Sequence, residues 1–106
     1  MIKIDKYFFY WNIYQFAMEI CVTRFNNITF SENQNWIKEN NSAIGCIYGC
    51  PVKISENILP YTKLIVLEMN NSKNIIEGIG IIENNCAQEN KKYYKIYTDN
   101  NYNRYI

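Results

Sequence analysis

The side chains that could carry out chemistry in this 106-residue chain are few in kind. The sequence contains no histidine, and its only aspartates are Asp5 and Asp99. The absence of histidine excludes a Ser-His or Cys-His nucleophile pair, an imidazole general base and any histidine-ligated metal or haem. An enzyme built from this sequence would have to use glutamate, lysine, tyrosine, cysteine or backbone groups.

The four cysteines are Cys21, Cys46, Cys50 and Cys86, and the segment CIYGC separates the middle two by three residues. This spacing fits a zinc knuckle only loosely, because neither of the other cysteines has a close partner in the sequence. No convincing secretion signal accompanies them, which argues against a disulfide framework. We expect reduced thiols that pack as small hydrophobic groups in an intracellular protein, cytoplasmic or nuclear, with no metal and no cofactor.

Composition and charge indicate one soluble domain over residues 1–106, with 48% hydrophobic and 20% charged residues. The 17 asparagines and 18 isoleucines are attributed to codon bias in an AT-rich genome rather than to function. The net charge of +1 gives no global electrostatic case for nucleic acid. However, residues 91–106 carry four Lys/Arg against one Asp, and this basic end is also rich in tyrosine. Residues 7–22 are apolar but too short and too polar to span a bilayer, so no membrane partner is expected.

The first half of the chain is expected to contain a strand and up to two helices. The chain can begin with a strand, and apolar residues then recur at helical spacing over about 5–23, although their aromatic density also suits a strand. The capping box S-E-N-Q at 31–34 predicts a short helix over about 32–40, with Trp36 and Ile37 facing inward.

Strands dominate the prediction for the second half. AIGCIYG and YYKIYT are expected strands, and KLIVLEM forms a hairpin with IIEGIGII through a polar loop. In the second hairpin strand Gly78 and Gly80 share one face and leave a strip without side chains, which we call the glycine strip. Such a strip allows a bend in the strand, close packing of a helix, or the approach of a ligand to the backbone. The final RYI reads as the start of a strand, explained either by truncation of the chain or by pairing with a partner. Together these elements predict an α+β fold, a small curved mixed β-barrel with one or two helices packed against it.

The order of a tryptophan-bearing helix, IGCIYGCPVKI, LIVLEMN and EGIGII resembles the PUA-like superfamily, which includes the PUA, ASCH, EVE and YTH domains. The likeness covers roughly residues 31–98. It implies a single PUA-like domain that binds single-stranded RNA or DNA, or a modified base. A looser likeness to uncharacterised proteins of large DNA viruses, through EMNN, GIG and YNRY, suggests a virus-infected cell as the setting.

Base recognition would require an aromatic face, polar edges and cations for phosphate. Candidate pocket residues are Trp36, Asn40, Ser42, Tyr48, Glu68 and Asn70; the candidate basic-aromatic tail comprises Lys91, Lys92, Lys95, Tyr97 and Arg104. Structural roles compete with these assignments: Trp36 as a core residue, Asn40 as a helix terminator and Tyr48 as a barrel residue. The tail could equally be an edge strand guarded by lysines.

Three functional classes follow from the sequence. The leading hypothesis is the nucleic-acid or modified-nucleotide binding module. The second is a protein–protein adaptor or self-associating structural protein that uses an edge strand. The third is a nucleoside hydrolase on the ASCH pattern, for which Lys53 and Glu68 are the only obvious pair, although nothing in their spacing brings them together. No catalytic residue is assigned.

Overall fold

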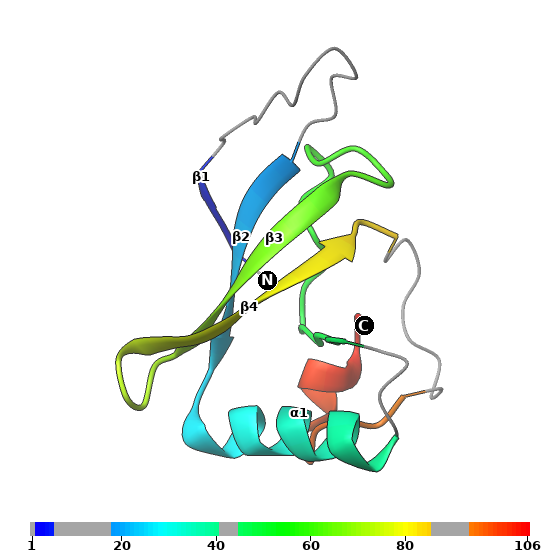
Figure 1. The fold of residues 1–106 in the computed structure, drawn as a ribbon. Coiled ribbons are helices and arrows are strands. Elements are labelled where there is room, and N and C mark those ends of the chain that lie inside the picture. Colours follow the sequence, from blue (N-terminus) through cyan, green and yellow to red (C-terminus); the bar gives the residue numbers. More distant parts are fainter. Residues whose placement is uncertain (1, 6–17, 41–44, 86–93) are drawn as a thin grey trace.

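An open β-sheet with one α-helix beside it forms the fold (Figure 1). The computed structural model describes residues 2–5, 18–40, 45–85 and 94–106. The predicted α+β class is confirmed. No helix in these ranges is long and apolar enough to cross a membrane.

Within the described residues the sheet contains four strands in the order of the sequence: β1 (Ile2–Asp5), β2 (Met18–Phe25), β3 (Lys63–Asn70) and β4 (Ile75–Glu83). β1 and β4 each run antiparallel to their neighbour, whereas β2 and β3 run parallel. The sheet is therefore mixed, as expected. The predicted hairpin of KLIVLEM with IIEGIGII is also confirmed, as β3 and β4.

The predicted closed barrel is wrong. Across the described ranges, β1 and β4 stand at opposite ends of the sheet and do not pair with each other. AIGCIYG and YYKIYT, which were also expected to be strands, are not part of the sheet where they are described. Side-chain amides bind their backbone instead: Asn33 Nδ2 donates to the Ile47 carbonyl at 2.7 Å. Asn103 Oδ1 likewise accepts from the amides of Ile96 and Tyr97, both at 2.9 Å.

The C-terminal residues pair within the chain. Tyr105 and Cys50 exchange two backbone hydrogen bonds, of 2.9 and 3.1 Å, in an isolated antiparallel bridge. The expected final strand is therefore a single bridge, preceded by a short 3-10 helix at Asn100–Asn103. This bridge joins the C-terminal residues to the segment around Cys50.

β2 occupies residues for which helical spacing predicted a helix. Cys21, Thr23 and Phe25 are buried at every second position, as on the core face of a strand. The prediction of a helix over 18–23 is wrong because the core face of β2 also carries the polar residues Glu19 and Thr23, so its period of two does not show in the pattern of apolar residues. The remainder of that predicted helix lies outside the described residues.

Helix α1 (Asn27–Glu39) begins five residues before the predicted start at residue 32. Asn26 is the N-cap: its Oδ1 accepts from the Thr29 amide at 2.8 Å, while Thr29 Oγ1 accepts from the Asn26 amide at 3.0 Å. This reciprocal pair is a capping box of the kind predicted at 31–34, but it lies five residues earlier in the chain. The helix is confirmed and its predicted start is wrong.

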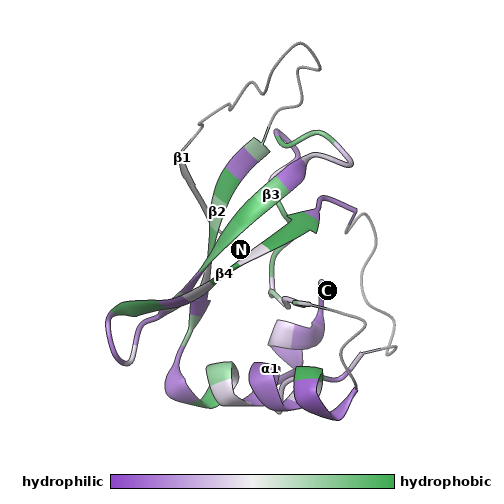
Figure 2. Cartoon of the chain, in the orientation of Figure 1, coloured by the Kyte–Doolittle hydropathy of each residue, from purple (hydrophilic) through white to green (hydrophobic). Residues whose placement is uncertain are grey.

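The buried side of α1 is polar. Most of the helix is hydrophilic, whereas most of β3 is hydrophobic (Figure 2). Thr29 and Asn33 are its buried residues, and Trp36 and Ile37 are only half-buried. Hydrogen bonds rather than an apolar stripe therefore hold this helix in place. The core on the sheet side is made by Cys21, Phe25, Tyr48, Ile58, Leu64, Val66, Ile96 and Tyr97.

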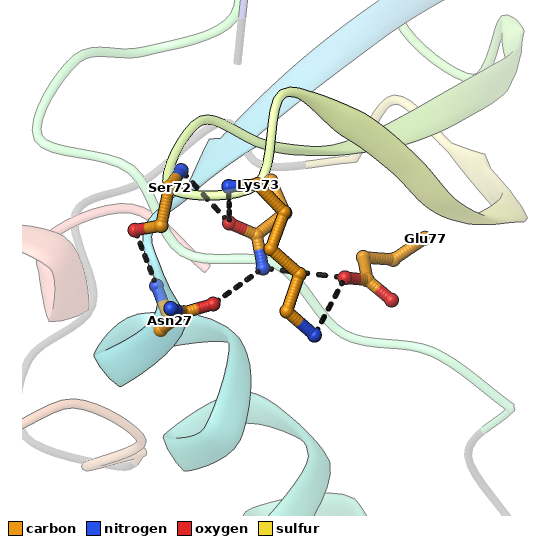
Figure 3. A network of polar contacts seen from close by, with 5 residues as sticks. Asn27, Ser72, Lys73 and Glu77 are labelled. Atoms are coloured by element: carbon orange, nitrogen blue, oxygen red, sulfur yellow. Dashed lines mark hydrogen bonds and ion pairs between the residues drawn. The ribbon is translucent and has the colours of Figure 1, made fainter.

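The turn of the β3–β4 hairpin is organised by Asn70, which is completely buried. The residues that it contacts, Asn27, Ser72, Lys73 and Glu77, are labelled in Figure 3. Its Oδ1 accepts from the amides of Ser72 and Lys73, at 2.9 and 3.3 Å. Its Nδ2 donates to Asn27 Oδ1 at 3.1 Å and to Glu77 Oε1 at 3.3 Å. The same side chain thus closes the turn and joins it to the first residue of α1.

Candidate functional site

The glycine strip of β4 lies against two predicted site residues, Tyr48 and Glu68. A Cβ atom on Gly80 would overlap the Tyr48 hydroxyl and lie 2.9 Å from Cys46 Sγ. A Cβ atom on Gly78 would lie 2.7 Å from Glu68 Oε1. Close packing is therefore one use of the strip, and a tyrosine and a carboxylate, rather than a helix, pack on it.

Tyr48 and Glu68 form a hydrogen-bonded pair. The Tyr48 hydroxyl donates to Glu68 Oε2 at 2.5 Å. Burial raises the pKa of Tyr48 far above its usual value, and the hydrogen bond to Glu68 raises it further, so the tyrosine stays neutral and acts as a donor. No hydrogen bond to Glu68 Oε1 occurs among the described residues, and this oxygen is left beside Gly78.

A groove of about 460 Å³ lies between α1 and β4, and we call it the β4 groove. It is lined by Gln34, Ile37, Gly45, Cys46, Glu68, Gly78, Ile79, Gly80 and Ile81. Among these lining residues Glu68 is the only charged one. The groove thus combines apolar walls, one amide, one carboxylate and the backbone of a strand that bears no side chain at two positions.

β4 is an edge strand of the described sheet, and its outer backbone faces this groove. The Asn84 amide donates to the Thr62 carbonyl at 2.9 Å, and antiparallel pairs alternate between hydrogen-bonded and non-hydrogen-bonded. Ile79 and Ile81 therefore turn their N–H and C=O groups away from β3. Consistently, Cys46 Sγ donates to the Ile81 carbonyl at 3.7 Å. The side chains of Ile79 and Ile81 are 66% and 62% exposed.

This edge lacks the usual protection against strand addition. Natural edge strands are commonly guarded by exposed lysine or by proline. β4 contains neither, and its two glutamates are ion-paired to lysines outside the strand. Glu83 binds Lys63 at 2.7 Å, and Glu77 binds Lys73 at 3.5 Å. The described edge is therefore apolar, with its charges already paired.

The other predicted pocket residues lie away from the β4 groove or outside the described residues. The Trp36 ring packs edge-on against Tyr94, with centroids 5.6 Å apart. Asn40 ends α1, where its amide and its Nδ2 both donate to the Trp36 carbonyl, at 3.0 and 2.9 Å. Asn70 organises the hairpin turn, as described above. Ser42 lies outside the described residues.

The basic-aromatic tail is divided between core and surface. Tyr97 is buried, whereas Lys95 and Arg104 are exposed. The Arg104 guanidinium lies over the ring of the following tyrosine, 5.4 Å from its centroid. Lys91 and Lys92 lie outside the described residues.

The cysteines and Lys53 bear on the remaining alternatives. Cys46 and Cys50 are half-buried and line a second, mostly apolar cavity of about 360 Å³ beside Tyr48. Within the described ranges, no group of three or more His, Cys, Asp or Glu side chains is placed to hold a metal. Lys53 lines a different cavity from Glu68, so they are not brought together in one site, as the nucleoside-hydrolase hypothesis would need.

Tyr97 is expected to make the stability of the protein fall in alkaline solution. Burial raises its pKa from 10.0 to about 12, against the lowering effect of hydrogen bonds from Asn33 and Gly49. Its contribution is fully present below pH 10.0 and is lost as pH rises to about 12, because the unfolded chain releases the proton first. Urea unfolding across this range should show a smaller fall for Tyr97→Phe. An equal fall in both proteins would contradict this assignment.

Sequence reasoning placed Tyr48 and Glu68 at the site but missed the groove walls, Gln34 and Ile37, and the outer edge of β4. The sequence of β4 does show that the strand lacks lysine and proline, which is a signal of an unprotected edge. It could not be used, because the sequence does not show which hairpin strand lies at the edge of the sheet. Comparison of the chain with protein-family models, with curated proteins and with solved structures gives no match.

Proposed function

We propose that this protein is a protein-interaction module that takes up an extended peptide segment as an additional strand along β4. The observation that carries this proposal is the unguarded edge of β4, whose outward backbone groups and exposed isoleucines border the β4 groove. In such strand addition, main-chain hydrogen bonds supply affinity and pockets for alternate side chains supply specificity.

The walls of the groove suit an extended chain. Ile37 of α1 lines the groove, and the side chains of Ile79 and Ile81 point to the face of β4 opposite Gly78 and Gly80, so an added strand would meet apolar surface on both of its faces. The volume of about 460 Å³ lies in the range of sites that hold small ligands or a few side chains. Cys46 Sγ makes a weak hydrogen bond to the Ile81 carbonyl on the outer backbone of the described groove, and an added strand would replace it.

The test is a selection from a random peptide library on the immobilised chain, followed by anisotropy measurements with an enriched peptide. We expect Ile79→Lys to weaken binding by about tenfold, because a lysine at an edge blocks strand pairing. The matched control is Ile75→Lys, since Ile75 is also an exposed isoleucine of β4 but does not line the groove.

Amide hydrogen exchange gives the structural readout. The amides of Ile79 and Ile81 should gain protection when the peptide binds, because they would enter a new ladder. Failure to enrich any peptide, or equal loss of affinity in both lysine variants, would contradict the proposal.

The nucleic-acid module predicted from the sequence is the second candidate. One observation favours it: the exposed pair of Lys95 and Arg104, the latter stacked on a tyrosine, resembles surfaces that bind single strands. It ranks second because the rings of Trp36 and Tyr97 are packed against other side chains, and because no cation lines the β4 groove among the described residues.

A further inference from the structure

The carboxylate of Glu68 is the single charge that the described walls of the β4 groove present to an incoming chain. Tyr48 holds Oε2 through a hydrogen bond of 2.5 Å, which fixes the carboxylate and leaves Oε1 for another donor. A fixed carboxylate oxygen in a partly apolar groove is a strong acceptor for a cationic donor.

Gly78 keeps this oxygen open toward the edge of the sheet. Any Cβ atom at this position would lie 2.7 Å from Oε1, so a side chain here would cover or displace the carboxylate. Glu68 pairs with Gly78 in the β3–β4 register and therefore points to the same face of the sheet. Neighbouring strands lie about 4.8 Å apart, so a residue of an added strand opposite Gly78 would be within reach of the carboxylate.

Resting on the peptide-binding function proposed above, we infer that the β4 groove selects a segment that carries a lysine or arginine opposite Gly78, where its cationic group binds Glu68 Oε1. The charge balance supports this partner: the described lining holds one carboxylate and no cation. The glutamates of β4 itself, Glu77 and Glu83, are already ion-paired to lysines, so they do not compete for the incoming cation.

On the side of the basic residue that runs along Ile79 and Ile81, the segment should be apolar or β-branched. Side chains of an added strand alternate between the two faces of the sheet. One neighbour of the basic residue would lie beside Ile79, and the residue three positions away on the same side would lie beside Ile81; both isoleucines are more than half exposed. The other neighbour would lie beside Glu77. The expected ligand is thus an extended segment with apolar residues at the first and third positions to one side of a lysine or arginine.

The experiment is a parallel selection from one random peptide library on the unmodified chain and on Glu68→Gln. Glutamine keeps an acceptor for Tyr48 but removes the negative charge. An enriched peptide is then synthesised with its basic residue intact or replaced by norleucine. The unmodified chain should bind the basic peptide about tenfold more tightly than the norleucine peptide, as expected for a charge-assisted hydrogen bond. Glu68→Gln should bind the two peptides almost equally, whereas Glu39→Gln, an exposed glutamate of α1 outside the groove lining, should behave as the unmodified chain.

The outcomes separate the two proposals. Enriched peptides that protect the Ile79 amide but show no preference for a basic residue would overturn this inference and leave the peptide-binding function standing. A basic preference that survives in Glu68→Gln would overturn it as well. Absence of any enriched peptide, or self-association through β4 that excludes peptides, would overturn the peptide-binding function and the inference with it.

Discussion

Replacing Gly49 with alanine is expected to destabilise the protein by about 3 kcal/mol or more, which is the upper range for overpacking a filled site. A Cβ atom at this position would overlap the backbone carbonyl oxygen of Tyr102. It would also lie 2.8 Å from Tyr97 Cε2 and 2.9 Å from Ile106 Cδ1. A backbone oxygen cannot move aside by changing a rotamer, so the C-terminal 3-10 helix must shift as a unit.

The measurement is thermal and urea unfolding of Gly49→Ala followed by circular dichroism. The midpoint temperature should fall by at least about 10 °C for a domain of this size. Gly45→Ala is the matched control, because no atom lies within 4 Å of a Cβ built at Gly45. A Gly49→Ala protein as stable as the control would show that the C-terminal residues do not pack on this segment.

Asn33→Ala is expected to produce the second large loss, about 3 kcal/mol, because unpaired buried polar groups cost about 1–3 kcal/mol each. Asn33 is completely buried in α1. Its Nδ2 donates to the Ile47 carbonyl at 2.7 Å and to the Tyr97 hydroxyl at 3.1 Å. One amide thus joins the helix to two segments far away in the sequence, and alanine would leave both acceptors without this donor.

Asn35→Ala provides the control for this second prediction. Asn35 lies on the same helix but is exposed, so its replacement should change the free energy of unfolding by less than about 0.5 kcal/mol. Urea unfolding of the two variants side by side gives the comparison. Equal stability of Asn33→Ala and Asn35→Ala would mean that α1 is held by contacts other than this amide.

The sequence predicted what depends on local pattern. The β3–β4 hairpin follows from alternating apolar residues around a polar loop, and α1 follows from a capping signal, although the wrong one was chosen. The buried asparagines do not follow from local pattern, because codon bias is enough to explain their abundance in the sequence. Asn33, Asn70 and Asn103 are all buried, and each uses its amide as a substitute for a backbone partner. Seventeen similar residues give no local sign of which three would be buried.

The candidate site was predictable only in part for the same reason. Tyr48 and Glu68 were both assigned to the site, and the structure brings them into contact. Tyr48 and Glu68 make this contact over Gly80 and Gly78, where a side chain would leave no room for them. That the two glycines share one face could be derived from strand alternation alone. The groove could not be derived, because it depends on which strand ends the sheet and on where α1 lies beside it. Both are long-range properties.

The parallel pairing of β2 with β3 has a consequence for the order of folding. These strands are neighbours in the sheet although α1 and the segment 40–62 separate them in the chain, so their pairing must close a long loop. A hairpin such as β3–β4 forms within about 1–10 μs, whereas long-range pairings of this kind are slow. The nascent hairpin therefore exposes two edges before β2 arrives. One of them, β4, is still at the edge of the described sheet after β2 has paired, so chains that fold at high concentration can associate with one another along it.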